Sequence, residues 1–338
     1  MPRIWGARTL APLFPDKSAL LEPIGEVWLS GDENIFASGP FVGRRLADAW
    51  REMPVEWRGT RLAGDGPFPL LVKFLFPKEK LSIQVHPDDD YAHKYEAAAG
   101  GRGKTEMWYA IRAQPGAAVL VGLKPGETPD SFTHAIVQGT AEECLETLPL
   151  KAGDAIFVPA GTVHTINPGS VLCEIQENSD ITYRVFDYNR LTPEGQPRAL
   201  HIEQALAVIN FEEKSGGRLE PVRLTRGDVT ETYFVACRYF ATEKWEFARR
   251  SAAVTSPQHF DLLIFLEGRG RIESNGGTVN YGPAEVWLLP AGLGAYQLAP
   301  SMPTALLCTY VPDIANDFVR RLSEQKVEES AWARLVYP

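Results

Sequence analysis

The sequence of 338 residues predicts a mainly β fold, with two antiparallel β-barrels and a few short helices. Three observations support this fold class. Short apolar runs alternate with turn residues along most of the chain. The chain contains 29 Gly and 26 Pro, enough to supply many turns. A weak internal repeat relates one segment of the first half to one segment of the second half.

Seven apolar runs between residues 69 and 188 have the length and composition of strands. They are PLLVKFLF, LSIQVH, EMWYAI, AAVLVGL, DAIFVPA, VLCEIQE and ITYRVFDY. Their spacing is short and irregular, which favours antiparallel pairing over strand–helix–strand units. Helical patterns cover only residues 43–53, 129–148, 202–209 and 312–325. We expect the second of these to break near Gly139 into two short helices, with Thr140 as an N-cap.

The internal repeat relates AGDAIFVPAGTVHTI at 152–166 to YGPAEVWLLPAGLGAYQL at 281–298. Aligning the shared Pro-Ala-Gly places His164 opposite Ala295, so only the first copy carries an imidazole at that position. The repeat predicts domains at 1–205 and 206–338, joined around EEKSGGRLEP at 212–221. The alternative is chance, because Pro-Ala-Gly is a common turn.

Composition limits the class of protein. Hydrophobic residues make up 44% and charged residues 23%, values of a soluble globular protein, and the net charge of −9 argues against a nucleic-acid-binding surface. An apolar run of membrane-spanning length is absent, and MPRIWGARTLAPLF lacks the apolar core of a secretory signal. The four cysteines form no CxxC motif. We therefore expect a cytoplasmic protein without membrane partners, either a monomer or a homodimer.

A candidate metal site begins in LSIQVHPDD. Strict alternation in this run places Gln84 and His86 on one face of a strand. Glu106, at the start of the next strand pattern, and His164, after the Pro-Ala-Gly, complete a set of two imidazoles and one carboxylate from separate strands. Such a set suits zinc or another divalent cation. The alternative is that each residue has an ordinary structural role.

A second cluster lies in VLCEIQENSDITYRVFDYNR. Glu174 and Gln176 share one face of a strand, and Arg184 follows among apolar residues. An Arg in such surroundings either pairs with a carboxylate, for example that of Glu174, or awaits an anionic ligand. The pattern leaves both readings open.

These motifs resemble the type I mannose-6-phosphate isomerases, in their short bacterial form, which are zinc enzymes of the cupin superfamily. The segments that carry the resemblance are LSIQVHPDD, GKTEMWYAI, KAGDAIFVPAGTVHTI, EIQENSDITYRVFDYNR and the N-terminal WGARTL with PIGEVWLS. They cover residues 1–205. Two departures are EVWLSGDE in the N-terminal segment and Thr165 after the metal histidine.

The resemblance implies two cupin-type β-barrels, or jelly rolls: a catalytic one at 1–205 and a degenerate one at 206–338. It implies one zinc ion per chain, held by His86, Glu106, His164 and the weaker donor Gln84. It implies Arg184 as an essential active-site residue, with Lys104 and Glu174 assisting proton transfer or substrate orientation.

The implied reaction is the interconversion of mannose 6-phosphate and fructose 6-phosphate. The sequence leaves open whether Lys104, Glu174 or a water on the metal is the base. Two alternatives remain, an iron-dependent cupin dioxygenase and a cupin that binds a sugar phosphate without turnover. The Gln-x-His and Lys-x-Glu patterns argue against the dioxygenase, and the complete set of proposed site residues argues against a pure binding protein.

Overall fold

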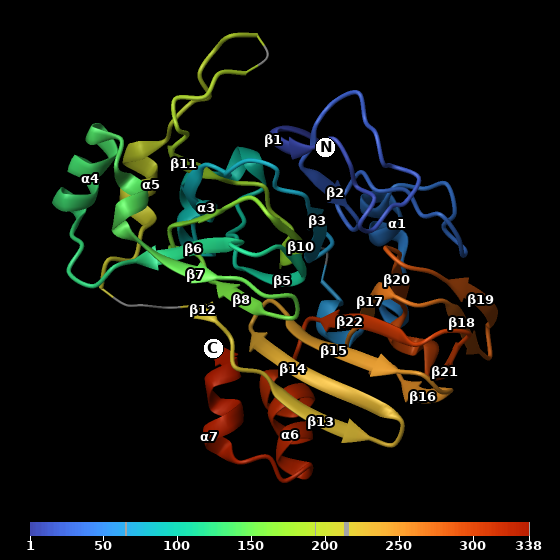
Figure 1. The fold of residues 1–338 in the computed structure, drawn as a ribbon. Coiled ribbons are helices and arrows are strands. Elements are labelled where there is room, and N and C mark those ends of the chain that lie inside the picture. The colour runs from blue at the N-terminus through green and yellow to red at the C-terminus, as the bar shows by residue number, and fades with distance from the viewer. Residues whose placement is uncertain (65, 193, 213–215, 338) are drawn as a thin grey trace. The chain divides into compact units, whose positions relative to one another are not determined.

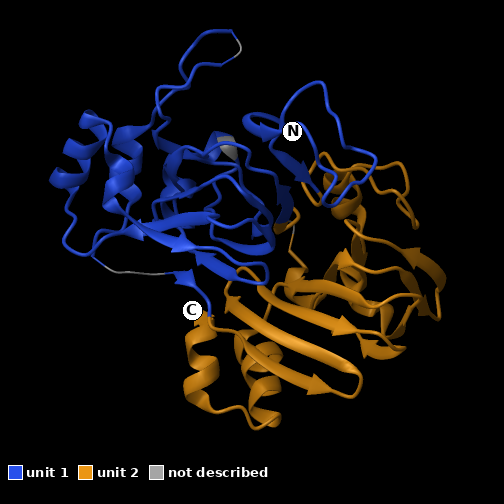
Figure 2. Ribbon diagram, viewed as in Figure 1, with its two compact units in different colours: residues 1–28, 71–219 blue, residues 29–70, 220–338 orange. Residues whose placement is uncertain are grey.

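The computed structural model describes residues 1–64, 66–192, 194–212 and 216–337. The chain divides into two compact units (Figure 2). Unit 1 comprises Met1–Trp28 and Leu71–Leu219, and unit 2 comprises Leu29–Leu70 and Glu220–Pro338. Three residues of the expected linker, Glu213 to Ser215, lie outside the described residues.

Unit 1 contains two sheets whose neighbouring strands pair antiparallel (Figure 1). The six-stranded sheet has the order β12-β8-β5-β10-β3-β2, and the five-stranded sheet has the order β11-β4-β9-β6-β7. The strands of the first are β2 Glu26–Trp28, β3 Leu70–Leu75, β5 Glu106–Ala113, β8 Ala155–Val158, β10 Ser170–Glu177 and β12 Gly217–Arg218. Those of the second are β4 Ile83–Val85, β6 Ala118–Leu123, β7 Leu145–Pro149, β9 His164–Ile166 and β11 Tyr183–Phe186. All seven apolar runs therefore form strands as predicted.

The remaining elements of unit 1 are short. They are β1 Pro2–Ala7, α3 Asp89–Tyr95, η2 Ala97–Ala99, α4 Pro129–Gln138, η3 Ala141–Cys144 and α5 Ile202–Val208. Helix α4 starts with a capping box between Thr128 and Ser131 and ends at Gly139 in the left-handed conformation.

Two details of the predicted 129–148 helical segment are wrong. The residues after Cys144 form strand β7, because they pair with β6 at the edge of the five-stranded sheet. Thr140 precedes η3 but does not cap it, since its hydroxyl donates to the Ala135 carbonyl instead. Tertiary pairing outweighs the helical pattern here.

The first Pro-Ala-Gly turn joins β8 to β9 and helps to position both His86 and His164. Gly161 has a φ of +80°, a conformation that side chains disfavour, and an added Cβ would lie 2.9 Å from the Val208 carbonyl oxygen. Its backbone N–H donates to the His86 carbonyl at 2.8 Å. Since β9 begins three residues later, at His164, the turn brings both imidazoles to one end of the sheet.

Unit 2 has a seven-stranded sheet, β13-β14-β15-β22-β17-β20 with β23 paired parallel to β14, and a four-stranded antiparallel sheet, β16-β21-β18-β19. The strands of the larger sheet are β13 Val222–Arg226, β14 Val229–Cys237, β15 Ala241–Phe247, β17 Asp261–Glu267, β20 Val286–Leu289, β22 Thr304–Tyr310 and β23 Val336–Tyr337. Those of the smaller sheet are β16 Ser251–Val254, β18 Gly270–Ser274, β19 Gly277–Tyr281 and β21 Ala295–Pro300.

The helices of unit 2 are α1 Leu46–Glu52, α2 Val55–Arg58, η1 Thr60–Leu62, η4 Ala291–Leu293, the π-helix η5 Ile314–Val319, α6 Arg320–Glu324, α7 Glu329–Trp332 and η6 Ala333–Leu335. Residues 29–70 join this unit through a buried aromatic cluster. Trp50 meets Phe68 edge-on at 5.1 Å and Phe260 at 5.5 Å, which fixes α1 against the start of β17.

The prediction of a mainly β, antiparallel protein with few short helices is thus confirmed. Among the described strands, none of the four sheets closes on itself into a barrel, so the closed form of the two predicted barrels is not seen. The repeat is visible in the element order, because β8–turn–β9 and β20–η4–β21 carry the two Pro-Ala-Gly sequences.

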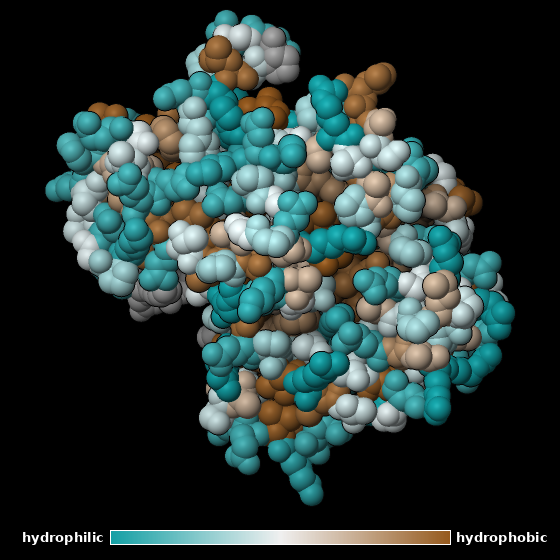
Figure 3. All heavy atoms as spheres, viewed as in Figure 1, coloured by the Kyte–Doolittle hydropathy of each residue, from teal (hydrophilic) through white to brown (hydrophobic). Residues whose placement is uncertain are grey.

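The face drawn in Figure 3 is mostly hydrophilic, with apolar residues in scattered groups. The described helices include none with the length and apolar character needed to cross a bilayer.

Candidate metal centre and active site

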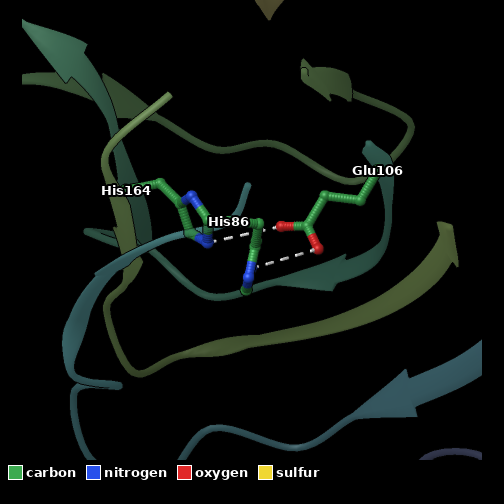
Figure 4. A group of neighbouring side chains, drawn as sticks. All are labelled: His86, Glu106 and His164. Atoms are coloured by element: carbon green, nitrogen blue, oxygen red, sulfur yellow. Dashed lines mark ion pairs between the residues drawn. The ribbon is translucent and has the colours of Figure 1, made fainter. Parts of the chain in front are cut away.

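Three side chains from three strand ends of unit 1 converge on one point (Figure 4). His86 follows β4, Glu106 begins β5 and His164 begins β9. Potential ligand atoms of all three lie within 4.8 Å of one another, and each residue is only 1% exposed. His164 Nε2 lies 3.4 Å from one Glu106 oxygen, and His86 Nε2 lies 3.7 Å from the other. This is the only such cluster among the described residues.

Both imidazoles are oriented as metal ligands. His86 Nδ1 lies 2.7 Å from the Ile181 carbonyl oxygen, and His164 Nδ1 lies 2.9 Å from that of Thr162. Because a carbonyl only accepts, each Nδ1 carries the proton and each Nε2 presents a lone pair to the site. Burial lowers the pKa of His164 to about 4 and that of His86 well below its ordinary value. Both rings are therefore neutral at pH 7, as cation binding requires.

The carboxylate of Glu106 fits the same interpretation. Both of its oxygens are buried without a hydrogen-bond partner among the described residues. A buried carboxylate is costly unless positive charge compensates it; the Lys104 ammonium lies 3.1 Å from Oε2, whereas Oε1 faces the neutral His164 ring. The donor set of two imidazole nitrogens and one carboxylate suits zinc and leaves further positions open, as catalytic sites require.

Gln84 lies beside these three residues. It is directly opposite His164 in the β4–β9 pair, and its Nε2 lies 3.4 Å from His164 Nε2. Its Oε1 accepts a hydrogen bond from Ser82 at 3.1 Å. In this orientation the amide nitrogen faces the cluster, so a rotation of the amide is needed before its oxygen can act as a ligand.

Lys104 also belongs to this site. Its Nζ lies 3.1 Å from Glu106 Oε2 and 3.2 Å from His86 Nε2, and the side chain is buried. Burial alone would lower the pKa of Lys104, but the negative charges of Glu106 and Glu174 outweigh burial and raise it. Lys104 is therefore an ammonium fixed beside the candidate ligands.

Glu174 lies behind the cluster on β10, opposite Trp108 of β5. The indole N–H of Trp108 donates to Glu174 Oε2 at 3.0 Å, and Lys73 Nζ lies 3.4 Å from Oε1. Burial, together with the charge of Glu106, raises the pKa of Glu174. Glu174 thus pairs with Trp108 and Lys73. Arg184, which the sequence had left open as a partner of Glu174, is not among the partners found in the described residues.

Arg184 lies on the same rung of the sheet as Gln84 and His164. It is opposite Gln84 in the β11–β4 pair, and opposed residues in antiparallel strands share a face. Its Nη1 donates to the Ala199 carbonyl at 2.9 Å, while its buried Nε has no partner among the described residues. Burial, reinforced by Arg198, lowers the pKa of Arg184. A donor of this guanidinium is therefore free for a ligand.

Sequence reasoning missed two contributors. Lys73 is 2% exposed on β3, bridges Glu174 and Asp180, and stacks over Trp28 at 4.7 Å. Asp187 accepts from both Arg190 and Arg198, so its single negative charge offsets half of the positive charge that these two guanidinium groups place near Arg184. For Lys73, the sequence offered one signal, its position in the middle of the apolar run PLLVKFLF. A lysine buried in such a strand needs charged or polar partners.

Comparison with known proteins identifies the family to which this chain belongs. Residues 4–111 match the family model of the phosphomannose isomerase type I catalytic domain, and residues 230–308 match that of the mannose-6-phosphate isomerase cupin domain. The probable mannose-6-phosphate isomerase GmuF of Bacillus subtilis is 36% identical over 302 residues, which span 88% of this chain and 92% of that protein. The chain belongs to the mannose-6-phosphate isomerase family. Residues 230–308, which match the cupin-domain model, lie in unit 2.

Other members of the family are similar to this chain in sequence or in fold. Mannose-6-phosphate isomerase ManA of Bacillus subtilis is 34% identical over 309 residues, with the same shares of each chain covered. The crystal structure of a Bacillus subtilis mannose 6-phosphate isomerase superposes with a TM-score of 0.81 at 30% identity, covering 91% of this chain and 96% of that one. A zinc-bound mannose 6-phosphate isomerase shares the fold, with a TM-score of 0.70 at 18% identity over 92% and 97% of the two chains.

Proposed function

We propose that this protein is a zinc-dependent aldose–ketose isomerase that interconverts mannose 6-phosphate and fructose 6-phosphate. The observation that carries the proposal is the convergence of the buried side chains of His86, Glu106 and His164, with the Nε2 atoms of both neutral imidazoles turned toward the carboxylate. Family membership supplies the substrate, because the curated relatives are named for this isomerisation.

One zinc ion per chain would be held by His86, Glu106 and His164, with Gln84 as a fourth, weaker ligand. When bound, the metal supplies Lewis-acid stabilisation of the negative charge that develops on the substrate oxygens. With the divalent cation bound, the neutral imidazoles and the single negative charge of Glu106 would leave a net positive charge at the metal, which suits an anionic enediolate.

The chain's own residues supply the remaining steps. Isomerisation removes a proton from C2 of mannose 6-phosphate and returns one at C1, through an enediol. Glu174 and Lys104 are the groups that we assign to hold or move this proton, since both are buried beside the cluster. Arg184 would stabilise the developing charge or hold the substrate with its unpartnered Nε.

The wider organisation forms part of the proposal. We propose that the catalytic cupin jelly roll lies within the predicted domain 1–205, in its unit 1 part, and that the predicted domain 206–338 contains a degenerate one that lacks the imidazole. The repeat supports this, because Ala295 begins β21 where His164 begins β9. A cytoplasmic location is proposed as well, and four buried free cysteines are compatible with a reducing compartment.

A coupled assay of mannose 6-phosphate conversion, with metal content measured on the same sample, tests the function. We expect turnover that a chelator abolishes and that zinc restores. Restoration by ferrous iron with oxygen consumption would favour a dioxygenase. Binding of the sugar phosphate without turnover would favour a non-catalytic cupin.

A further inference from the structure

We infer that unit 2 contains a second ligand site, a cavity for a neutral polyhydroxylated molecule of the size of one or two hexose rings. The cavity has a volume of about 800 Å³, within the roughly 300–1,000 Å³ typical of small-molecule sites. All of its lining residues belong to unit 2. The inference goes beyond the proposed isomerase function and stands without it.

Both sheets of unit 2 line the cavity. Strands β15, β17 and β22 contribute from the larger sheet, and β16, β18 and β21 contribute from the smaller one, with η5 and α6 beside them. Tyr296 and Ala295, at the start of β21, belong to the lining. The repeat aligns Ala295 with His164, so the lining includes the strand of unit 2 that follows the second Pro-Ala-Gly, as β9 follows the first in unit 1.

The floor of the cavity carries buried charged groups. Glu243, whose side chain is 2% exposed, accepts two hydrogen bonds from Arg321, at 2.8 and 3.2 Å. Asp261 lies 3.1 Å from His259, a histidine that the sequence did not single out, and His259 stacks on Tyr310 with ring centroids 4.5 Å apart. Carboxylate acceptors and guanidinium donors are thus presented together.

Every arginine that lines this cavity has a carboxylate partner. Arg321 pairs with Glu243, Arg226 with Glu231 at 2.6 Å, and Arg320 with Glu324 at 3.8 Å. A phosphate would therefore meet no uncompensated cation, and it would approach the buried carboxylates of Glu243 and Asp261. These charges disfavour an anionic ligand.

The Tyr296 hydroxyl provides an independent indication of a ligand. Tyr296 is 2% exposed, and its hydroxyl has no hydrogen-bond partner among the described residues. Buried hydroxyls are nearly always hydrogen-bonded, so this group can take a partner that enters the cavity, either a water or a ligand. A sugar hydroxyl both donates and accepts, and it therefore suits a lining of carboxylates, guanidinium groups and a phenol. Trp245 and Tyr310 add aromatic surface for the ring's C–H groups.

Isothermal titration of the intact protein with free D-mannose tests the inference, with inorganic phosphate as the comparison probe. Tyr296→Phe removes only the unpartnered hydroxyl, and we expect it to weaken mannose binding about 5- to 20-fold. Ala253→Trp adds bulk to the lining opposite Tyr296 on β16, and we expect it to abolish binding. Both variants should retain wild-type isomerase turnover.

Two matched controls accompany these variants. Tyr281→Phe removes a buried hydroxyl that bonds Thr304 and lies outside the lining, and Ala248→Trp adds the same bulk at an exposed position outside it. Both should bind mannose like the wild type. Three results would overturn the inference: no mannose binding by the wild type, mannose binding that Tyr296→Phe leaves unchanged, or phosphate that binds in competition with mannose. If Ala253→Trp fails to fold, Tyr296→Phe with its control decides alone.

Discussion

Arg184 and Gln84 lie directly opposite each other in the β11–β4 pair, and Gln84 in turn lies opposite His164 in the β4–β9 pair. Opposed residues of antiparallel strands share a face, so one rung of the sheet carries a guanidinium, an amide and an imidazole side by side. A shift of one residue in either strand would turn the guanidinium to the other face. The register thus connects the proposed charge-stabilising residue to the candidate metal ligands.

This register leads to the first prediction. Arg184→Ala should leave zinc content and folding close to wild type, because Arg donates nothing to a metal and the apolar residues of β11 remain. Turnover should fall by at least ~10²-fold, the scale for removal of one preorganised charge-stabilising group. The measurement is kcat and KM for mannose 6-phosphate on zinc-replete protein.

Arg184→Lys is the conservative companion variant. An ammonium keeps the charge but loses the planar fork of donors, so we expect only partial recovery of turnover. A raised KM with unchanged kcat would mean that Arg184 holds the substrate equally in the ground and transition states. Wild-type values in both variants would exclude Arg184 from the active site.

The second prediction concerns the metal. His164→Ala should remove bound zinc and activity together, because it deletes one of the three proposed ligands, an imidazole whose Nδ1 is already held by the Thr162 carbonyl. His134→Ala, at an exposed position on α4, is the matched control and should retain both. Metal content by atomic emission and turnover are measured on the same samples. Full zinc occupancy in His164→Ala would refute the assigned ligand set.

The third prediction concerns Lys73, the buried cation beside Glu174. Lys73→Met keeps the length of the side chain but leaves the Glu174 carboxylate with only the Trp108 indole as a partner. Breaking a buried pair in this way typically costs about 3–5 kcal/mol. Urea unfolding of the zinc-replete protein should show a loss of that order. Lys78→Met, at an exposed position a few residues later, should change stability little.

A double variant separates charge from packing at this pair. Combining Lys73→Met with Glu174→Gln removes the unpaired carboxylate, so part of the lost stability should return. Strictly additive losses would mean that Lys73 stabilises unit 1 by packing alone, for example through its stacking on Trp28.

The contrast between Lys73 and Gln84 shows what the sequence can reveal about this site. Gln84 and His86 alternate with apolar residues, so their shared face was visible as a period of two. Strand β3 is buried on both faces, so its residues show no alternation and Lys73 has no face that the pattern could assign. Its role depends on Glu174, about 100 positions later, and such pairing appears only in the fold.

The same reason explains the error at β7. Residues 145–149 carry a helix-compatible pattern, and only their pairing with β6 makes them a strand. Glu106 and His164 could be predicted as candidates because each begins a strand next to a recognisable turn or motif. Their convergence within 4.8 Å required the sheet order β11-β4-β9-β6-β7, which no local pattern contains.

The last prediction concerns the pH dependence of stability. Glu26 is 9% exposed, accepts two hydrogen bonds from Arg3 at 2.9 and 3.1 Å, and accepts a third from the Trp28 indole at 2.7 Å. Burial alone would raise the pKa of Glu26, but Lys73 and Arg3 outweigh burial and lower it from 4.5 to about 2. The folded state therefore favours the ionised carboxylate more strongly than the unfolded state does.

A lowered folded-state pKa contributes stability above the unfolded pKa, and this contribution is lost as the pH falls from about 4.5 toward 2. By the usual 1.4 kcal/mol per pKa unit, it is on the order of 3 kcal/mol at pH 7. Glu26→Gln should destabilise the protein by about that amount at pH 7 and by progressively less between pH 4.5 and pH 2, where the wild-type carboxyl is protonated first in the unfolded chain and then in the folded protein. Urea unfolding of both proteins at several pH values measures the difference in their free energies of unfolding, in which the contributions of all other titrating groups cancel.

The exposed control Glu22→Gln should follow the wild type throughout. A destabilisation by Glu26→Gln that stays constant from pH 7 to pH 3 would show that shape and packing, rather than charge, account for the contribution of Glu26.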